Sequence, residues 1–504
     1  MKKLILLTIL SVIITKTQSQ SLTLDTLQYA RAEAYKKNFD AADNILTIYN
    51  AHNSDINALR LQAQVLYWKK EFGRSEATYE RALKLFPGDK LLLLDYGRML
   101  WELKKLARAE ALLTEYLLHD RQHAEANMML AYIIYWNGQN HAAKEKLDIV
   151  LNAFPGNEEG LALLKQIETA TAPYIKTGGH YASDDQPLKT SGFSAEAGWY
   201  RSWLLSPVIQ FNSVHAVLNN TNYNSVWVQA GNKISFKHTG LSFNFKGGVF
   251  NHPTADNTIL TGAASLSLKL SNAISLNAGT ERMPYQYTTT SIKIPVMQQH
   301  SVVAIHFNKN KKWLGKAAFE LVGFDDNNKI KTFYVWSLLP LFDNKNVSLK
   351  AGYAFNYSNA DDNVFTPTQS ISAIVASTAP GSQVAGYYNP YFSPCKQTVH
   401  SMLAYAGLRF SKNVQFTSRA SIGFAANALQ PTLTFTKNQA NNFSVEKTYA
   451  NQKYTPLEFN NEISISLSDR FTTAIMHEYG SLLFYTVNRG SIHLEYAFLH
   501  DKKK

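Results

Sequence analysis

The stretch of sequence that decides the fold is residues 151–181, LNAFPGNEEGLALLKQIETATAPYIKTGGHY. Before it, apolar residues recur every three to four positions, as in AYIIYW at residues 131–136, and this is the period of an amphipathic helix. After Pro173 apolar and polar residues alternate, which is the period of a strand with two different faces. The sequence therefore predicts a helical part and a β part that meet at Pro173.

The composition of the 504 residues is that of a folded protein, because 45% are hydrophobic and only 17% are charged. The net charge of +12 is unevenly distributed: residues 174–504 carry 29 Lys and Arg against 18 Asp and Glu. A basic surface suits nucleic acid, anionic lipid headgroups or an anionic solute. The chain has no motif of the known nucleic-acid modules, so we expect no nucleic-acid partner.

The first residues indicate export from the cytoplasm. Lys2 and Lys3 precede an uncharged apolar run over residues 4–14, and Thr17-Gln18-Ser19 offers small residues for cleavage before Gln20. The run is shorter than the ~20 residues of a membrane-spanning helix. Residues 1–19 are therefore predicted to be a cleaved secretory signal. A single cysteine, Cys395, excludes intrachain disulfides and fits an exported protein.

The helical part is repetitive. Pro87 and Pro155 lie 68 residues apart, which is twice the 34-residue tetratricopeptide (TPR) period, and units of this length begin near Leu22, Ile56, Lys90 and Ala124. Small residues are needed where the two helices of a unit cross, since only a short side chain lets the backbones approach. The period places small residues at Ala41, Ser75, Ala109 and Ala143 on the second helices and at Gly97 on a first helix.

These residues resemble the TPR family over about residues 22–157. The resemblance implies an all-α superhelix whose groove binds a protein or peptide. Residues 157–170 are expected to form the capping helix that covers the last face of such an array. We therefore assign residues 20–172 to four repeats plus a capping helix. The alternative is a spacer that holds the entrance of the β part away from another structure.

The β part consists of alternating segments such as LSFNFK at residues 241–246 and ASLSLK at residues 264–269, separated by polar turns. Strands of a soluble sandwich run about five or six residues, whereas strands that span a bilayer need about nine to eleven. The segments here are about ten to fifteen residues long, which favours the bilayer. Residues 173–504 are therefore predicted to form an antiparallel transmembrane β-barrel of about 14–16 strands.

Aromatic residues near segment ends suit girdles at the level of the lipid headgroups. They are Trp199, Tyr200, Trp203, Trp313, Phe333, Tyr334, Trp336, Tyr485 and Tyr496. The last segment places Ile492, Leu494, Tyr496 and Phe498 on one face, which resembles the terminal strand read by outer-membrane assembly machinery. These features predict a bacterial outer-membrane location, with the N-terminal domain in the periplasm.

Two connections, residues 361–394 and about 431–456, are longer than the other turns and are expected to be extracellular loops. The first contains GYYNPYFSP at residues 386–394, an aromatic and proline cluster suited to stacking on sugar rings. Its candidate glycan contacts are Tyr387, Tyr388, Tyr391 and Phe392. The alternative is a loop that packs its own aromatic side chains for rigidity.

Side chains that bear chemistry are expected on the lumen face of the barrel. The face-assigned candidates are Lys246, Lys269, His493 and Glu495, with an ordinary solvated wall as the alternative. A glycosidase needs two carboxylates that converge in a cleft. Paired acids such as Asp184-Asp185 lie in turn-like runs, and neighbouring residues of a strand point to opposite faces, so these pairs do not predict a glycosidase. His477-Glu478 lacks the second His of a helical zinc motif. We predict no catalytic residue, metal or cofactor.

A secretory signal, a TPR array and a C-terminal barrel, in that order, resemble the bacterial outer-membrane porins that export cellulose and poly-N-acetylglucosamine. YaiO-type outer-membrane barrels are a second family that the chain resembles. The export resemblance implies contacts between the TPR array and periplasmic partners, and passage of a nascent glycan through a barrel embedded in outer-membrane lipid. Charge complementarity suits an anionic or neutral glycan better than a cationic one.

Two other functions stay open at this point. One is a TPR scaffold that a plugged barrel tethers to the membrane, serving adhesion or envelope assembly. The other is an enzyme that modifies envelope glycans. Residues 171–179 are expected to cross the periplasmic rim of the barrel and to fix the orientation of the array. If this stretch is flexible, the array is a tethered recruiter and not an entrance funnel.

Overall fold

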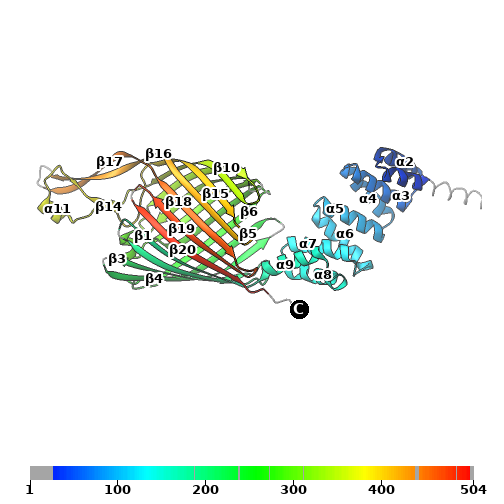
Figure 1. The fold of residues 1–504 in the computed structure, drawn as a ribbon, viewed down its shortest axis with the longest axis horizontal. Coiled ribbons are helices and arrows are strands. Elements are labelled where there is room, and N and C mark those ends of the chain that lie inside the picture. The colour runs from blue at the N-terminus through cyan, green and yellow to red at the C-terminus, as the bar shows by residue number, and fades with distance from the viewer. Residues whose placement is uncertain are drawn as a thin grey trace, which may run out of the picture. The chain divides into compact units, whose positions relative to one another are not determined.

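The computed structural model describes residues 26–499 apart from residues 187, 219, 237–238, 272, 310–311, 438–441 and 484 (Figure 1). The predicted signal at residues 1–19 lies outside this range. The chain divides into two compact units between Lys165 and Gln166, and each is considered by itself. None of the described helices combines the length and the apolar character needed to cross a membrane.

The first unit is helical, and its helices come in pairs. Residues 26–35 are helical and precede α2; α9 is a single helix that follows the fourth pair. The helices are α2 (Phe39–His52), α3 (Ile56–Trp68), α4 (Phe72–Leu85), α5 (Lys90–Glu102), α6 (Leu106–His119), α7 (Ala124–Trp136), α8 (Asn140–Ala153) and α9 (Glu158–Thr171). Three first helices, α3, α5 and α7, begin at 34-residue intervals.

Local sequence explains where the helices start and stop. The side chain of Asp55 accepts a hydrogen bond from the backbone N–H of Asn57, and that of Asp89 accepts from Leu91 and Leu92, so both residues are helix N-caps. A left-handed residue ends the first helix of each pair. These residues are Lys37 (φ 63°), Lys70 (φ 64°), Lys104 (φ 61°) and Gly138 (φ 83°).

The crossing points of the helix pairs correct one expectation. Ser75, Ala109 and Ala143 are fully buried, whereas Ala41 is exposed and its neighbour Ala42 is fully buried. The reason is spacing, because α2 and α4 begin 33 residues apart and not 34. The prediction for Ala41 was therefore wrong by one residue, and Ala42 occupies the packing position.

The core of this unit is aliphatic with one aromatic pair. Leu59, Leu93, Leu100 and Leu113 belong to its largest buried cluster, and the rings of Tyr79 and Tyr96 stack with centroids 5.0 Å apart. At Gly97 an added Cβ would lie 3.0 Å from the Leu113 side chain, so the two helices approach as closely as a glycine allows.

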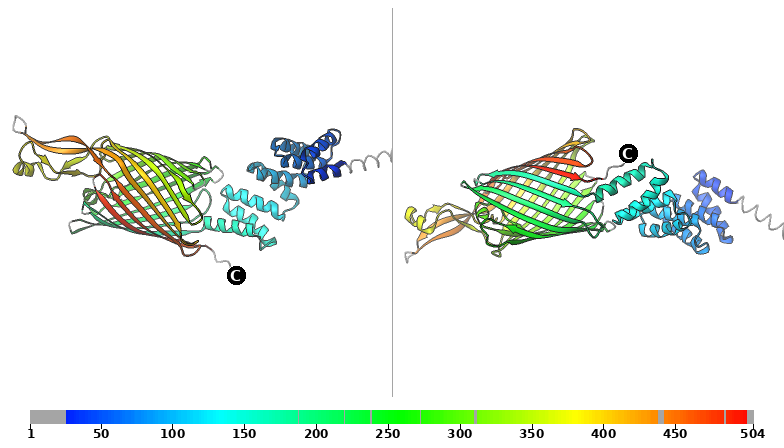
Figure 2. Two further views of the ribbon diagram at one scale, coloured as in Figure 1. Left: turned by 45° about the horizontal axis from the view of Figure 1, so that its top comes forward. Right: turned by 90° about the horizontal axis from the view of Figure 1, so that it is seen from below.

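The second unit is a closed antiparallel barrel of 16 strands, as predicted (Figures 1 and 2). Each strand pairs with its neighbours, and β1 pairs with both β2 and β20, which closes the ring. The strands are β1 (Tyr174–Asp184), β2 (Lys189–Gly198), β3 (Pro207–Leu218), β4 (Thr221–Phe236), β5 (Leu241–Asn251), β6 (Ile259–Lys269), β7 (Ile274–Pro284), β8 (Met297–Lys309), β9 (Trp313–Phe324), β10 (Lys329–Asp343), β11 (Val347–Ala360), β15 (Gln397–Arg409), β16 (Val414–Lys437), β18 (Leu457–Ser466), β19 (Phe471–Ser481) and β20 (Thr486–Ala497).

The barrel has two different rims. The terminal rim, defined by the paired residues Tyr174 and Ala497, carries short turns. The opposite rim, here called the loop rim, carries α10 (Thr289–Lys293) and the long connection 361–396. That connection contains β12 (Phe365–Pro367), α11 (Ile371–Ser377), β13 (Gln383–Val384) and β14 (Gly386–Tyr388).

The second predicted loop, residues 431–456, is mostly regular structure. Strand β16 runs to Lys437, and β17 (Phe443–Tyr454) pairs back along it, with Pro431 opposite Tyr449. This hairpin and α11 project beyond the barrel wall in Figure 1. The prolines at 431 and 456 suggested a loop, but the barrel strand continues through Pro431 into the hairpin.

Strand residues alternate between an apolar exterior and a polar interior. On the outside, Ile209, Phe245 and Ile492 have 48%, 42% and 46% of their surface exposed, an arrangement typical of a lipid-facing wall. Only Ala172 and Pro173 separate α9 from β1, so the connection between the last helix and the first barrel strand is two residues long. Tyr174 is already paired with Gly198 and Ala497.

Candidate functional site in the barrel lumen and the helical groove

Lys246 lies on the inner face of β5, since its neighbour Phe245 faces outward. Its Nζ donates a hydrogen bond to Gln210 Oε1 at 2.6 Å and lies 3.7 Å from Glu196 Oε2. A network of one cation, one amide and one carboxylate therefore spans β2, β3 and β5 on the lumen side.

His493 and Glu495 alternate on β20 with the outward-facing Ile492 and Leu494. Both line a cavity of about 370 Å³ that Lys176 also lines, and Lys176 Nζ lies 3.3 Å from Glu495 Oε2. The structure thus places these two candidates on the same inner face.

Lys269 occupies a different position from the other lumen candidates. It is the last residue of β6, it is exposed, and its backbone N–H donates to the Gly240 carbonyl oxygen at the terminal rim. Because Lys269 alternates with Leu268, its side chain belongs to the inner face, but β6 ends at this residue. Lys269 is therefore a rim residue and does not belong to the middle of the lumen.

Aromatic side chains inside the barrel were missed by the sequence prediction. They line a cavity of about 630 Å³ near the loop rim and comprise Tyr285, Tyr287, Tyr334, Trp336, Phe392, Tyr454 and Tyr485. Tyr334, Trp336 and Tyr485 were expected in the lipid girdles, and that prediction was wrong. The alternation of β10 could have placed two of these rings inside the barrel. Phe333 is 43% exposed and faces outward, so Tyr334 and Trp336 share the opposite, inner face.

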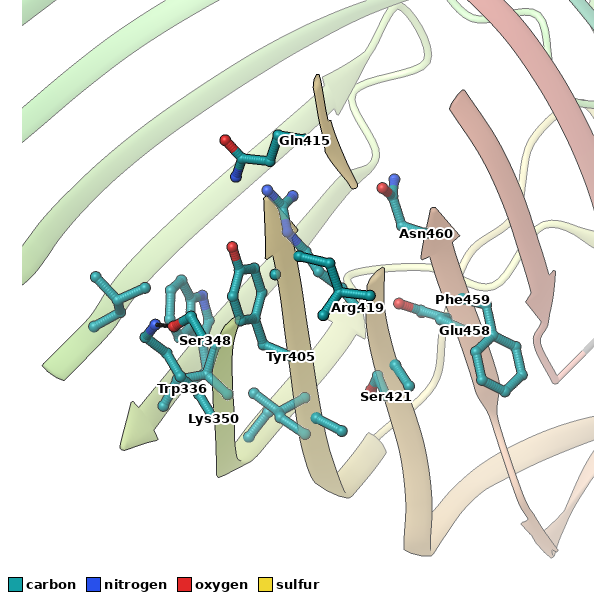
Figure 3. Close-up of a pocket in the computed structure, with 18 of the residues that line it drawn as sticks. Trp336, Ser348, Lys350, Tyr405, Gln415, Arg419, Ser421, Glu458, Phe459 and Asn460 are labelled. Atoms are coloured by element: carbon teal, nitrogen blue, oxygen red, sulfur yellow. Dashed lines mark hydrogen bonds between the residues drawn. The ribbon is translucent and has the colours of Figure 1, made fainter. Parts of the chain in front are cut away.

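A larger cavity of about 1260 Å³ lies in the lumen (Figure 3). Lys350, Tyr405 and Arg419 line it from β11, β15 and β16. On the other side of Figure 3, Glu458 points towards the cavity while its neighbour Phe459 lies on the other side of the strand. The wall therefore offers donors, acceptors and aromatic rings to the same space.

The aromatic loop cluster is largely buried, which corrects two of its four predicted glycan contacts. Tyr391 is 1% exposed, its ring stacks on Phe324 with centroids 3.5 Å apart, and its hydroxyl donates to Asp326 Oδ2 at 2.5 Å. Tyr388 is 7% exposed and packs edge-on against Phe365 and Phe392. Their rings hold the loop on the barrel and are closed to a surface ligand.

The other two predicted contacts remain accessible. Tyr387 is 37% exposed on the loop, and Phe392 lines the aromatic cavity of the lumen. The loop backbone is also fixed to the short helix α10, because the Thr288 hydroxyl donates to the Pro390 carbonyl oxygen at 2.5 Å. Packing of the loop against the barrel therefore decides which of its rings can meet a ligand.

A second candidate site is a groove in the helical unit, lined by Arg98, Trp101, Met128, Tyr132 and Phe154, with a volume of about 470 Å³. The buried Nε1 of Trp101 has no hydrogen-bond acceptor among the described residues. Burial and the nearby Glu159 carboxylate raise the pKa of Tyr132 to about 12. The groove thus presents aromatic surface beside charged side chains, while the indole N–H of Trp101 is closed to solvent.

Ion pairs run beside this groove from one repeat to the next. Arg60 donates to Asp95 at 2.5 Å, Arg98 donates to Asp95 at 3.1 Å, and Arg98 donates two bonds of 2.7 Å to Glu125. The hydrogen bond from Arg98 lowers the pKa of the Glu125 carboxyl group. The side chains at the groove are therefore held in place before any partner arrives.

Comparison with known proteins identifies the helical part. Residues 69–133 match the tetratricopeptide repeat family model. The helical unit, residues 26–171, is TPR-like. Among solved structures, a TPR protein described as having an unusual peptide-binding site, YrrB, is similar at 18% identity, covering 27% of this chain and 71% of its own, with a TM-score of 0.25. A TPR protein from Parabacteroides merdae matches at 13% identity over 29% and 59% of the two chains, with a TM-score of 0.28.

Another similar solved structure covers a larger share of this chain. It is described as a bacterial polysaccharide outer membrane secretin, with 9% identity, 65% of this chain and 99% of that chain covered, and a TM-score of 0.46. No curated protein matches the chain.

Proposed function

We propose that this protein is an outer-membrane channel for the export of an exopolysaccharide, with the TPR array in the periplasm binding protein partners or guiding the polymer. The observation that carries the proposal is the inner wall of the barrel, where Tyr334, Trp336 and Tyr405 line cavities beside charged and amide side chains. Aromatic rings pack on the apolar faces of sugars, and neighbouring polar groups bind sugar hydroxyls.

The two rims support the orientation. Outer-membrane barrels have short periplasmic turns and longer extracellular loops. By that rule the loop rim faces the outside and the terminal rim faces the periplasm, where the preceding TPR array then lies. The groove lined by Trp101 and Tyr132, with Arg98 beside them, offers aromatic surface and a cation to a peptide of a periplasmic partner.

Deletion of the gene, followed by measurement of secreted and cell-retained polymer, tests the proposal. We expect secreted polymer to fall and retained polymer to rise. Complementation with a Tyr334→Ala, Trp336→Ala double variant should restore export poorly, whereas the matched variant Phe333→Ala, on the outer face of the same strand, should restore it. Heat-modifiable gel migration of each variant reports whether the barrel has folded.

The rival functions give different results in the same strains. Unchanged secretion with altered envelope proteins would contradict export and favour a TPR scaffold tethered by its barrel. Unchanged secretion of a polymer with altered length or substitution would favour a glycan-modifying enzyme.

A further inference from the structure

Several charged side chains of the lumen wall lie beside a partner of opposite charge. Lys176 lies 3.3 Å from Glu495, Arg489 lies 3.5 Å from Glu478, and Lys246 lies 3.7 Å from Glu196. His300 likewise contacts Glu320 at 3.3 Å. These pairs lie on β1, β2, β5, β19 and β20, and the pair of His300 and Glu320 lies on β8 and β9.

One section of the wall differs, and we call it the basic wall. It consists of Lys316, Lys350, Arg409 and Arg419, on β9, β11, β15 and β16. Within the described part of the chain, no carboxylate oxygen lies within 4 Å of a charged nitrogen of these four side chains. Glu320 lies on the same face of β9 as Lys316 and accepts a hydrogen bond from Tyr334, whose ring lies under Lys316. Three of the four, Lys350, Arg409 and Arg419, line the cavity of about 1260 Å³.

Cross-strand register places the basic wall on one face. Lys350 is opposite Tyr405, and Tyr405 is opposite Arg419, so the three side chains emerge on the same side of β11, β15 and β16. Figure 3 shows the three side chains next to one another, with Tyr405 between Lys350 and Arg419. On β9, Lys316 is opposite Trp336, which lines the same cavity.

Aromatic rings take the place of the missing carboxylates. Lys350 Nζ lies 4.9 Å from the ring centroid of Tyr405, and Lys316 Nζ lies 4.8 Å from that of Tyr334. Lys350 is only 6% exposed, and its Nζ donates to Ser348 Oγ at 2.5 Å. A nearly buried cation without an acid is costly to maintain. A cation–π contact offsets part of that cost and leaves the positive charge available to an anion.

The basic wall has a sharp edge. The next strand, β18, carries Glu458 opposite Ser421 and Glu462 opposite Thr417, on either side of Asn460, which is opposite Arg419. The basic wall therefore ends at β16, beside a strand that carries two carboxylates. An anionic ligand is attracted to this side of the lumen and repelled from the adjacent strand, which fixes its path along the wall.

We propose that the basic wall binds a glycan bearing carboxylate groups, with Arg419 and Lys350 contacting the anionic groups while Tyr405 and Trp336 stack on the sugar rings. This inference rests on the proposed export function, for which it names the substrate class. Arg419 is the chief contact, because its side chain is exposed to the cavity and its guanidinium group suits a carboxylate bidentately.

Binding to the purified full-length mature chain in detergent tests the inference. The probes are fluorescently labelled hexagalacturonate, neutral maltohexaose and a cationic chitosan hexamer, measured by fluorescence anisotropy. We expect hexagalacturonate to bind at least about tenfold more tightly than maltohexaose and to lose affinity with rising salt. Arg419→Gln and Lys350→Gln should each weaken hexagalacturonate binding about threefold to tenfold.

The matched control is Lys309→Gln. Lys309 ends β8 on the outward face, opposite the exposed Trp313, and its loss should leave binding unchanged. Since Lys350 is buried, heat-modifiable migration checks its variant, and Arg419→Gln provides the exposed alternative. Equal binding of hexagalacturonate and maltohexaose, tighter binding of chitosan, no binding at all, or an unchanged affinity of Arg419→Gln would each overturn the inference. The export proposal fails separately, if gene deletion leaves secretion unchanged.

Discussion

The one-residue difference between Ala41 and Ala42 gives a sharp test of how the TPR units pack. Both residues are alanines near the start of α2, but Ala42 is fully buried and Ala41 is exposed. We expect Ala42→Leu to destabilise the helical unit and the matched variant Ala41→Leu to leave its stability nearly unchanged.

The magnitude follows from the burial. Leucine adds three carbons, and forcing additional methylenes into a packed site costs about 1–3 kcal/mol, while exposed substitutions stay within about 0.5 kcal/mol. For a unit of this size each kcal/mol lowers the melting temperature by about 2–4 °C. Ala42→Leu should therefore lower it by about 2–12 °C, and Ala41→Leu by no more than about 2 °C.

Circular dichroism at 222 nm, followed during heating of the full chain in detergent, reports the helical unit separately from the strands. Equal melting temperatures for the two variants, or a lower one for Ala41→Leu, would refute the packing register and restore the 34-residue spacing for the first unit.

Three further predictions concern the core, the groove and the loop. Leu113→Ala, at a fully buried position, should cost about 2–5 kcal/mol in denaturant unfolding of the helical unit, whereas Leu118→Ala, at a position 72% exposed, should cost almost nothing. The folded pKa of Glu125 lies below its ordinary value of 4.5, so the stabilising contribution of this carboxylate is present above pH 4.5 and disappears as the pH falls through the lowered pKa. The Glu125→Gln variant should therefore lose less melting temperature on acidification than the wild type. An equal loss in the two proteins would contradict this prediction. Tyr391→Phe removes the hydrogen bond from the tyrosine hydroxyl to Asp326, which should cost about 1–3 kcal/mol. Limited proteolysis should therefore cleave residues 361–396 faster in the variant than in the wild type. An unchanged rate would show that ring stacking alone holds the loop.

The sequence predicted the two-part fold well because each part follows a single period. Helical spacing identified the starts of α3, α5 and α7, and alternation identified the barrel strands. The prediction for Ala41 failed because the 34-residue period was extended into a unit that is one residue shorter. A better signal was present: KKNF at residues 36–39 and KKEF at residues 69–72 lie 33 residues apart, and each contains the left-handed lysine that ends a first helix.

The aromatic loop shows a different limit. Period and spacing apply to regular elements, but the burial of Tyr391 depends on Phe324, a residue of β9 far away in the sequence. Nothing in GYYNPYFSP itself distinguishes Tyr387, which is exposed, from Tyr388, which is buried. The alternative that the loop packs its own rings describes Tyr388, which packs against Phe365 and Phe392, whereas Tyr391 packs on the barrel.

Net charge shows the same limit for the lumen. The excess of lysine and arginine in residues 174–504 indicates a basic barrel, yet several of these residues, including Arg201, Lys312, Lys345 and Lys412, are exposed in turns at the terminal rim. Inside the barrel, cations such as Lys176 and Lys246 are matched by carboxylates. Charges at a rim mainly change the rate of encounter, whereas discrimination between ligands arises where charges are desolvated and in contact. For the anionic glycan proposed above, we therefore expect selection to depend on the cations of the basic wall, and the total charge of the barrel to be a poor guide to the substrate.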